Sequence, residues 1–143
     1  MPYEKTLRWS ALGFGLFFAL VVALGYLPSA NAGMGHVSMQ GSGEHQMFGL
    51  YMIGAADDVT HGLTALVFLL AAASSANASR LALLAFGWYY AIDASIYLVT
   101  GVVQHKPVVS NILLNLPHVV LSTIMLSLAY RRPRVPSEDR GGN

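Results

Sequence analysis

Ionisable side chains lie inside stretches of this chain that are otherwise apolar. Asp57, Asp58 and His61 occur in GLYMIGAADDVTHGLTALVFLLAA, Asp93 occurs in LALLAFGWYYAIDASIYLVTGVV, and His118 occurs in NILLNLPHVVLSTIMLSLAY. No Lys or Arg accompanies them within these stretches. Because a charged side chain in hydrocarbon costs at least about 2.5 kcal/mol, ionisable residues within a membrane span are candidates for function.

These residues are of the types that bind protons or metal ions. Imidazole and carboxylate groups suit divalent first-row metals such as Zn, Fe or Mn. The candidate centre joins the ionisable residues of three expected helices, namely His61, His118, Asp93, Asp57 and Asp58. Four polar residues share the same helix faces and would support the centre, namely Asn115, Tyr90, Tyr97 and Ser122. The sequence therefore predicts a buried His/Asp centre that binds a proton or a divalent metal, in the outer half of a helix bundle.

Two other interpretations of these residues stay open. In the first, the polar centre only holds the helices together, and the protein is a structural or accessory subunit of a larger membrane complex or a homo-oligomer. In the second, a b-type haem is held between His61 and His118, although the neighbouring aspartates would crowd the porphyrin. No nucleophile and base pair is visible, so the pattern favours a binding or structural protein over an enzyme.

A second set of potential ligands precedes the second apolar stretch. It contains thioether and imidazole groups, namely Met34, His36, Met39, His45 and Met47. Such groups suit soft or borderline ions such as Cu(I), but methionine is also common where adaptable packing is needed. The spacing is irregular, and this outer loop is a weaker candidate for a metal site.

The composition predicts the elements that position these residues. The chain has 143 residues, of which 55% are hydrophobic and 10% charged, and its mean hydropathy is +0.52, whereas a soluble domain carries about 25% charged residues. Four segments approach the roughly 20 apolar residues that a membrane span needs, and they cover about 10–27, 49–75, 80–103 and 109–130. The predicted fold is all-α, an integral membrane four-helix bundle over 1–132 with a disordered tail over 133–143. Cysteine is absent, which excludes disulfides and thiolate ligands.

The distribution of basic residues predicts the orientation. Seven of the eight Lys and Arg fall on one side of the expected spans, and only Lys106 falls on the other. By the positive-inside rule both termini are cytoplasmic in a bacterial inner membrane. The tail is short and adjoins a span, so it predicts contact with anionic lipid and no binding of nucleic acid.

The first apolar stretch has a competing interpretation as a signal peptide. Residues 1–32 combine basic residues, an apolar run and the sequence PSANA, which resembles a cleavage site. The run is longer than a typical signal core, and Ala11, Gly15, Ala19 and Ala23 form a row of small residues that suits helix packing in lipid. These features favour a retained helix.

Three motifs together resemble a group of small bacterial four-span membrane proteins catalogued only as a domain of unknown function. They are GLYMIGAADDVTHGLTALV, LLAFGWYYAID and LNLPHVVL, and the likeness covers roughly 10–130. In that group a histidine midway along helix two pairs with one early in helix four, which correspond here to His61 and His118. Helix two of the group more often has Asn where Asp58 stands, and helix four has an acid where this chain has Asn115. The resemblance implies the four-span fold and the pairing of the histidines, but no activity.

Overall fold

The computed structural model describes residues 3–25, 45–47 and 51–131, which form four long helices and a small hairpin. The helices are α1 (Tyr3–Gly25), α3 (Ala55–Ser74), α4 (Ala76–Val103) and α5 (Val108–Tyr130). Strands β1 (His45–Met47) and β2 (Tyr51–Ile53) pair antiparallel, with Gln46 opposite Met52. All four helices are long and apolar enough to cross a membrane. Within the described residues, the prediction of four long apolar helices is therefore confirmed.

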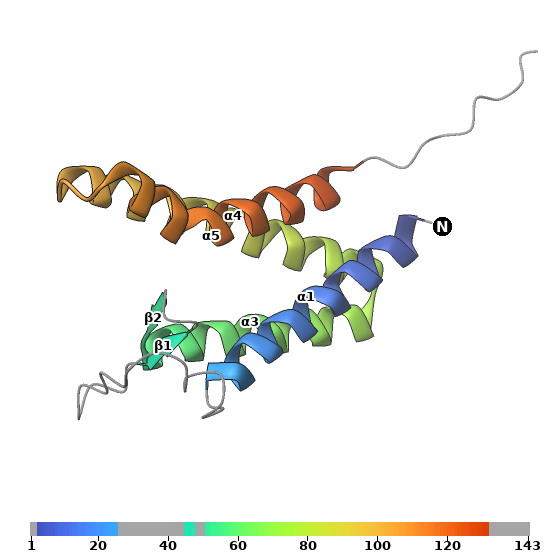
Figure 1. The fold of residues 1–143 in the computed structure, drawn as a ribbon. Coiled ribbons are helices and arrows are strands. Elements are labelled where there is room, and N and C mark those ends of the chain that lie inside the picture. The colour runs from blue at the N-terminus through green and yellow to red at the C-terminus, as the bar shows by residue number, and fades with distance from the viewer. Residues whose placement is uncertain (1–2, 26–44, 48–50, 132–143) are drawn as a thin grey trace, which may run out of the picture.

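The helices are arranged as two pairs. The most extensive contacts join α1 to α3 and α4 to α5, and α4 and α5 run antiparallel because a short turn connects them. Figure 1 shows that the two pairs are closest near the α3–α4 turn and diverge toward the opposite end. The buried residues of α4 accordingly cluster in its first two-thirds, from Ser79 to Ala94, with Gly101 as a separate buried position.

Small residues bring α1 and α3 close together. Ala11 and Gly15 of the predicted small-residue row are buried, whereas Ala23 is exposed. A Cβ atom added at Gly15 would lie 2.8 Å from the Leu69 side chain. Since helices in lipid associate largely through close van der Waals packing, a glycine at this contact is favourable.

Arginines from neighbouring helices cap two helix ends. Arg8 of α1 donates from Nε to the Ala72 carbonyl oxygen (2.9 Å) and from Nη2 to the Ala73 carbonyl oxygen (3.3 Å) in the last turn of α3. Arg80 of α4 donates from Nε to the Ala129 carbonyl oxygen at the end of α5 (2.9 Å). The last carbonyls of a helix lack partners within the helix and carry its negative dipole end, so a guanidinium group there is stabilising.

The start of α3 differs from the sequence prediction. A span was expected from about residue 49, but the helix begins at Ala55 because β1 and β2 occupy the preceding residues. Gly54 is the N-cap, and its N–H donates to Asp57 Oδ2 at 3.0 Å. Asp57 and Asp58 therefore lie in the first turn of α3, where a negative charge is stabilised by the helix dipole. A helix beginning near residue 49 would have placed them about two turns from its start.

Other helix boundaries also differ from the prediction, with less effect on the candidate site residues. Helix α1 begins at Tyr3 and α4 at Ala76, each earlier than the apolar runs alone indicated. The expected disordered tail over 133–143 lies outside the described residues.

Candidate functional site

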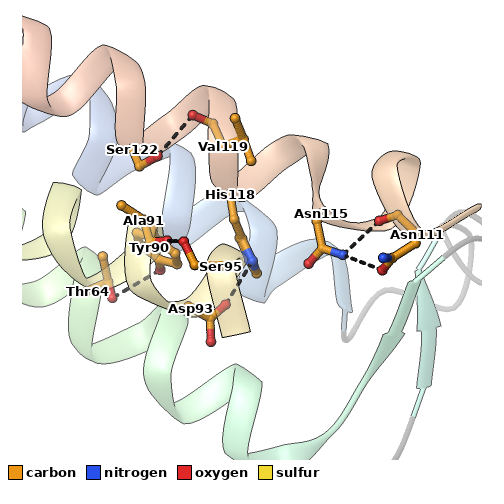
Figure 2. Close-up of polar contacts among 10 residues, drawn as sticks. All are labelled: Thr64, Tyr90, Ala91, Asp93, Ser95, Asn111, Asn115, His118, Val119 and Ser122. Atoms are coloured by element: carbon orange, nitrogen blue, oxygen red, sulfur yellow. Dashed lines mark hydrogen bonds and ion pairs between the residues drawn. The ribbon is translucent and has the colours of Figure 1, made fainter. Parts of the chain in front are cut away.

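The central polar contact of the structure joins α4 to α5. His118 Nδ1 lies 3.0 Å from Asp93 Oδ2, and the two side chains are 30% and 26% exposed. Figure 2 shows the His118 ring and the Asp93 carboxylate directed toward each other. Asp93 precedes the end of α4 by ten residues, and His118 follows the start of α5 by ten residues. Residues equidistant from the turn of an antiparallel helix pair meet at the same level, here about 15 Å from the helix ends.

Tyr90 connects this pair to the other helix pair. It precedes Asp93 by three residues and therefore lies on the same face of α4. Its ring is 5.2 Å from the His118 ring, and its hydroxyl is 3.4 Å from Thr64 Oγ1 of α3. Tyr90 is only 2% exposed. Figure 2 shows Thr64 of α3 next to Tyr90 of α4, with their contact as a dashed line. A buried tyrosine hydroxyl with a hydrogen-bond partner is the expected arrangement.

An aromatic series leads from this centre to His61. Phe18 of α1 stacks on Tyr90 with a centroid distance of 5.4 Å and on His61 with a centroid distance of 5.7 Å. Tyr90 in turn contacts His118. His61 and His118 are thus joined through Phe18 and Tyr90, and no direct ring contact between the two histidines occurs within the described part of the chain.

His61 carries a buried atom without a hydrogen bond. Its Nδ1 is the buried side-chain nitrogen or oxygen atom among the described residues for which no partner is found. Because a buried polar atom is rarely left unpaired in proteins, an unpaired one marks a position where a proton, water or ion can bind.

The remaining predicted site residues contribute unequally. Asp57 is exposed and caps α3, whereas Asp58 is buried. Tyr97 is 55% exposed and does not face the centre. Asn115 and Ser122 are buried but donate within α5, to Asn111 and to the Val119 carbonyl oxygen respectively. Of the four supporting residues that were predicted, only Tyr90 contacts the centre.

The structure does not gather the predicted ligands into one metal centre. Among the described residues no group of three or more His, Asp or Glu side chains could hold a metal ion. Within the outer loop, Met34, His36 and Met39 lie outside the described residues, and His45 and Met47 are the ends of β1. Phe18 and Tyr90 occupy the route between His61 and His118, so the packing also offers no support for a haem held by the two histidines.

Sequence reasoning missed two residues of the site. Phe18 follows Gly15 by three residues, so the helical spacing of the small-residue row would have placed Phe18, and not Phe17, on the packing face of α1. Thr64 follows His61 by three residues, so the helical-face argument that selected His61 would also have found it.

The described residues form four helices of membrane-spanning length, with a polar contact between α4 and α5. Comparisons with models of protein families, with curated proteins and with solved structures found no match. The resemblance to the small four-span bacterial group accordingly stays a prediction.

Proposed function

We propose that this protein is an integral inner-membrane protein whose Asp93–His118 pair binds an exchangeable proton. The observation that carries the proposal is the distance of 3.0 Å between His118 Nδ1 and Asp93 Oδ2 within helices of membrane-spanning length. Lys and Arg in the described helices occur only at Lys5, Arg8 and Arg80, within the first two turns of α1 and α4. The acid at Asp93 therefore has histidine, and no fixed cation, as its partner at this depth.

The ligand set favours a proton over a divalent metal. A protein metal site of the zinc or iron type uses three or four ligands from the protein, whereas the described residues provide a pair. A proton needs only one acceptor, and an imidazole beside a carboxylate supplies two. His61, with its unpaired Nδ1, is the second acceptor that the proposal assigns to the centre. A metal remains testable by measuring the metal content of the purified protein.

A structural role is the alternative that the geometry also supports. The Asp93–His118 contact and the hydrogen bond from Asn111 Nδ2 to the Leu98 carbonyl oxygen (3.0 Å) both join α4 to α5. Such contacts would hold the hairpin together without any change of protonation. In this case the protein would act through its lipid-facing surface, as a subunit of a larger assembly.

Asp93→Asn distinguishes the two roles. For a proton site we expect the wild-type protein in mild detergent to show a carboxylic-acid infrared band whose intensity changes across a pH titration. The variant should lack this band change, its Tm should depend less on pH, and it should lose about 1–2 kcal/mol of stability with the weakened hydrogen bond. Asp57→Asn is the matched control, because it removes an exposed carboxylate and should leave the band unchanged.

Identical infrared and melting curves for wild type and Asp93→Asn across this pH titration would contradict proton binding and favour the structural role. A band change that persists in Asp93→Asn and disappears in Asp57→Asn would move the site to the start of α3. Stoichiometric metal in wild type that is lost in His118→Gln would replace the proton by a metal ion.

The proposal includes an orientation with both termini in the cytoplasm. It is supported by the location of Lys5, Arg8, Arg80 and Arg131 at one end of the helices and of Lys106 at the other.

Because the chain has no cysteine, single-cysteine variants can test this orientation cleanly. Ser42→Cys should react with an impermeant thiol reagent from outside intact cells, and Ser74→Cys should react only after permeabilisation. The reverse labelling pattern would overturn the orientation.

A further inference from the structure

A pocket of about 580 Å³ lies at the basic end of the helices, away from the Asp93–His118 pair. It is an open pocket lined by the start of α1, the start of α4 and the end of α5. The polar residues that line it are Tyr3, Glu4, Asn77, Arg80, Tyr130 and Arg131. The lining thus brings together two guanidinium groups, two phenol rings and one amide from three helices that are distant in sequence.

The pocket has an excess of positive charge. Glu4 is the one carboxylate among the lining residues, and within the described residues it forms no ion pair with Arg80 or Arg131. Arg80 is oriented through Nε, which donates to the Ala129 carbonyl oxygen, so its other guanidinium N–H groups are not used by that contact. Guanidinium groups match phosphate oxygens in geometry and charge. The chemistry of the lining therefore favours an anion with several oxygens.

The surroundings of the pocket fit the boundary between water and lipid. Tyr130 is 57% exposed and Trp88 is 51% exposed, and Trp88 Nε1 donates to the Tyr130 hydroxyl at 3.2 Å. Tyrosine and tryptophan are enriched at this boundary. Leu81, the residue after Arg80, is 68% exposed, which provides an apolar surface for acyl chains beside the charged lining. A soluble anion would leave this apolar surface uncovered, whereas the acyl chains of a lipid would cover it.

We propose that this pocket binds the phosphate group of an anionic phospholipid, with Arg131 and Arg80 as its ligands and Tyr130 at its rim. The inference is independent of proton binding at Asp93. In the proposed orientation the pocket faces the cytoplasmic leaflet, whose anionic lipids attract Lys and Arg near the membrane surface.

The experiment uses the full-length protein in mild detergent. Short-chain phosphatidylglycerol, short-chain phosphatidylcholine and inorganic phosphate are titrated separately, and tryptophan fluorescence and Tm are followed. We expect saturable changes with phosphatidylglycerol and none with phosphatidylcholine or inorganic phosphate. The Tm should rise with phosphatidylglycerol because a bound ligand stabilises the folded state by mass action. Arg131→Gln should weaken the apparent affinity about five- to tenfold, because Arg131 has no hydrogen bond to the protein within the described residues whose loss would disturb the fold.

Lys5→Gln is the matched control, since it removes one positive charge at the same end from a residue that does not line the pocket. It should leave the affinity within about twofold of wild type if the charge acts locally. Equal weakening by Lys5→Gln and Arg131→Gln would overturn the site in favour of general surface charge. Equal responses to the two phospholipids would also overturn it, and a saturable response to inorganic phosphate that depends on Arg131 would replace the lipid by a free phosphate.

Discussion

Phe18→Ala is expected to lower the free energy of unfolding by about 3–5 kcal/mol, which is the usual loss when a buried phenylalanine is truncated. Phe18 is 1% exposed. Its ring stacks on His61 at 5.7 Å, on Tyr90 at 5.4 Å and on Phe68 at 6.4 Å. The truncation would therefore leave a cavity at the point where α1 contacts both α3 and α4. Denaturation of the purified protein in mixed micelles measures the loss.

The adjacent Phe17 is a matched control for this prediction. It has the same side chain on the same helix but is 44% exposed, so Phe17→Ala should lower stability by less than about 1 kcal/mol. Imidazole NMR signals provide a second readout, because Phe18→Ala should shift the His61 and His118 resonances while Phe17→Ala leaves them in place. Equal destabilisation by the two variants would contradict the central position of Phe18.

Gly101→Ala is expected to destabilise the protein by about 2–4 kcal/mol, through overpacking and the loss of a hydrogen bond. The Gly101 Cα faces the Asn111 side chain, and a Cβ atom there would collide with the Asn111 amide. That amide donates from Nδ2 to the Leu98 carbonyl oxygen (3.0 Å) and accepts from Asn115 Nδ2 through Oδ1 (3.2 Å). Moving it would disturb the polar contacts that hold α4 and α5 together near the turn that connects them.

Gly62→Ala provides the comparison for Gly101→Ala. A Cβ atom at Gly62 meets nothing within 4 Å, so alanine should stabilise the helix by about 0.5–1 kcal/mol through its better helix propensity. Opposite signs for the two glycine variants in the same unfolding assay are the expected result. A neutral Gly101→Ala would show that α5 can move away from α4 without loss.

The apolar runs were sufficient to predict four helices and their approximate ends. Hydropathy is a local property of the chain, and a run of roughly 20 apolar residues satisfies its backbone groups most simply as a helix. The contact between Asp93 and His118 could also be predicted from the sequence. Each residue lies ten positions from the helix end next to the α4–α5 turn, and the two helices run antiparallel.

The composition of the site depended on contacts that no local pattern encodes. Because the β1–β2 hairpin precedes it, α3 begins only at Ala55, and Asp57 and Asp58 lie in the first turn of this helix. Tyr90 is buried and Tyr97 is exposed although both lie on one polar stripe of the sequence, because the two helix pairs diverge toward the end of α4 (Figure 1).

Most of all, the docking of α1 inserts Phe18 between residues of α3 and α4, so that in the described part of the chain Phe18 and Tyr90 lie between His61 and His118. The sequence by itself determined which elements form and which residue types they carry. The tertiary structure decided which of those side chains meet, because helix rotation and packing depend on residues far apart in the chain.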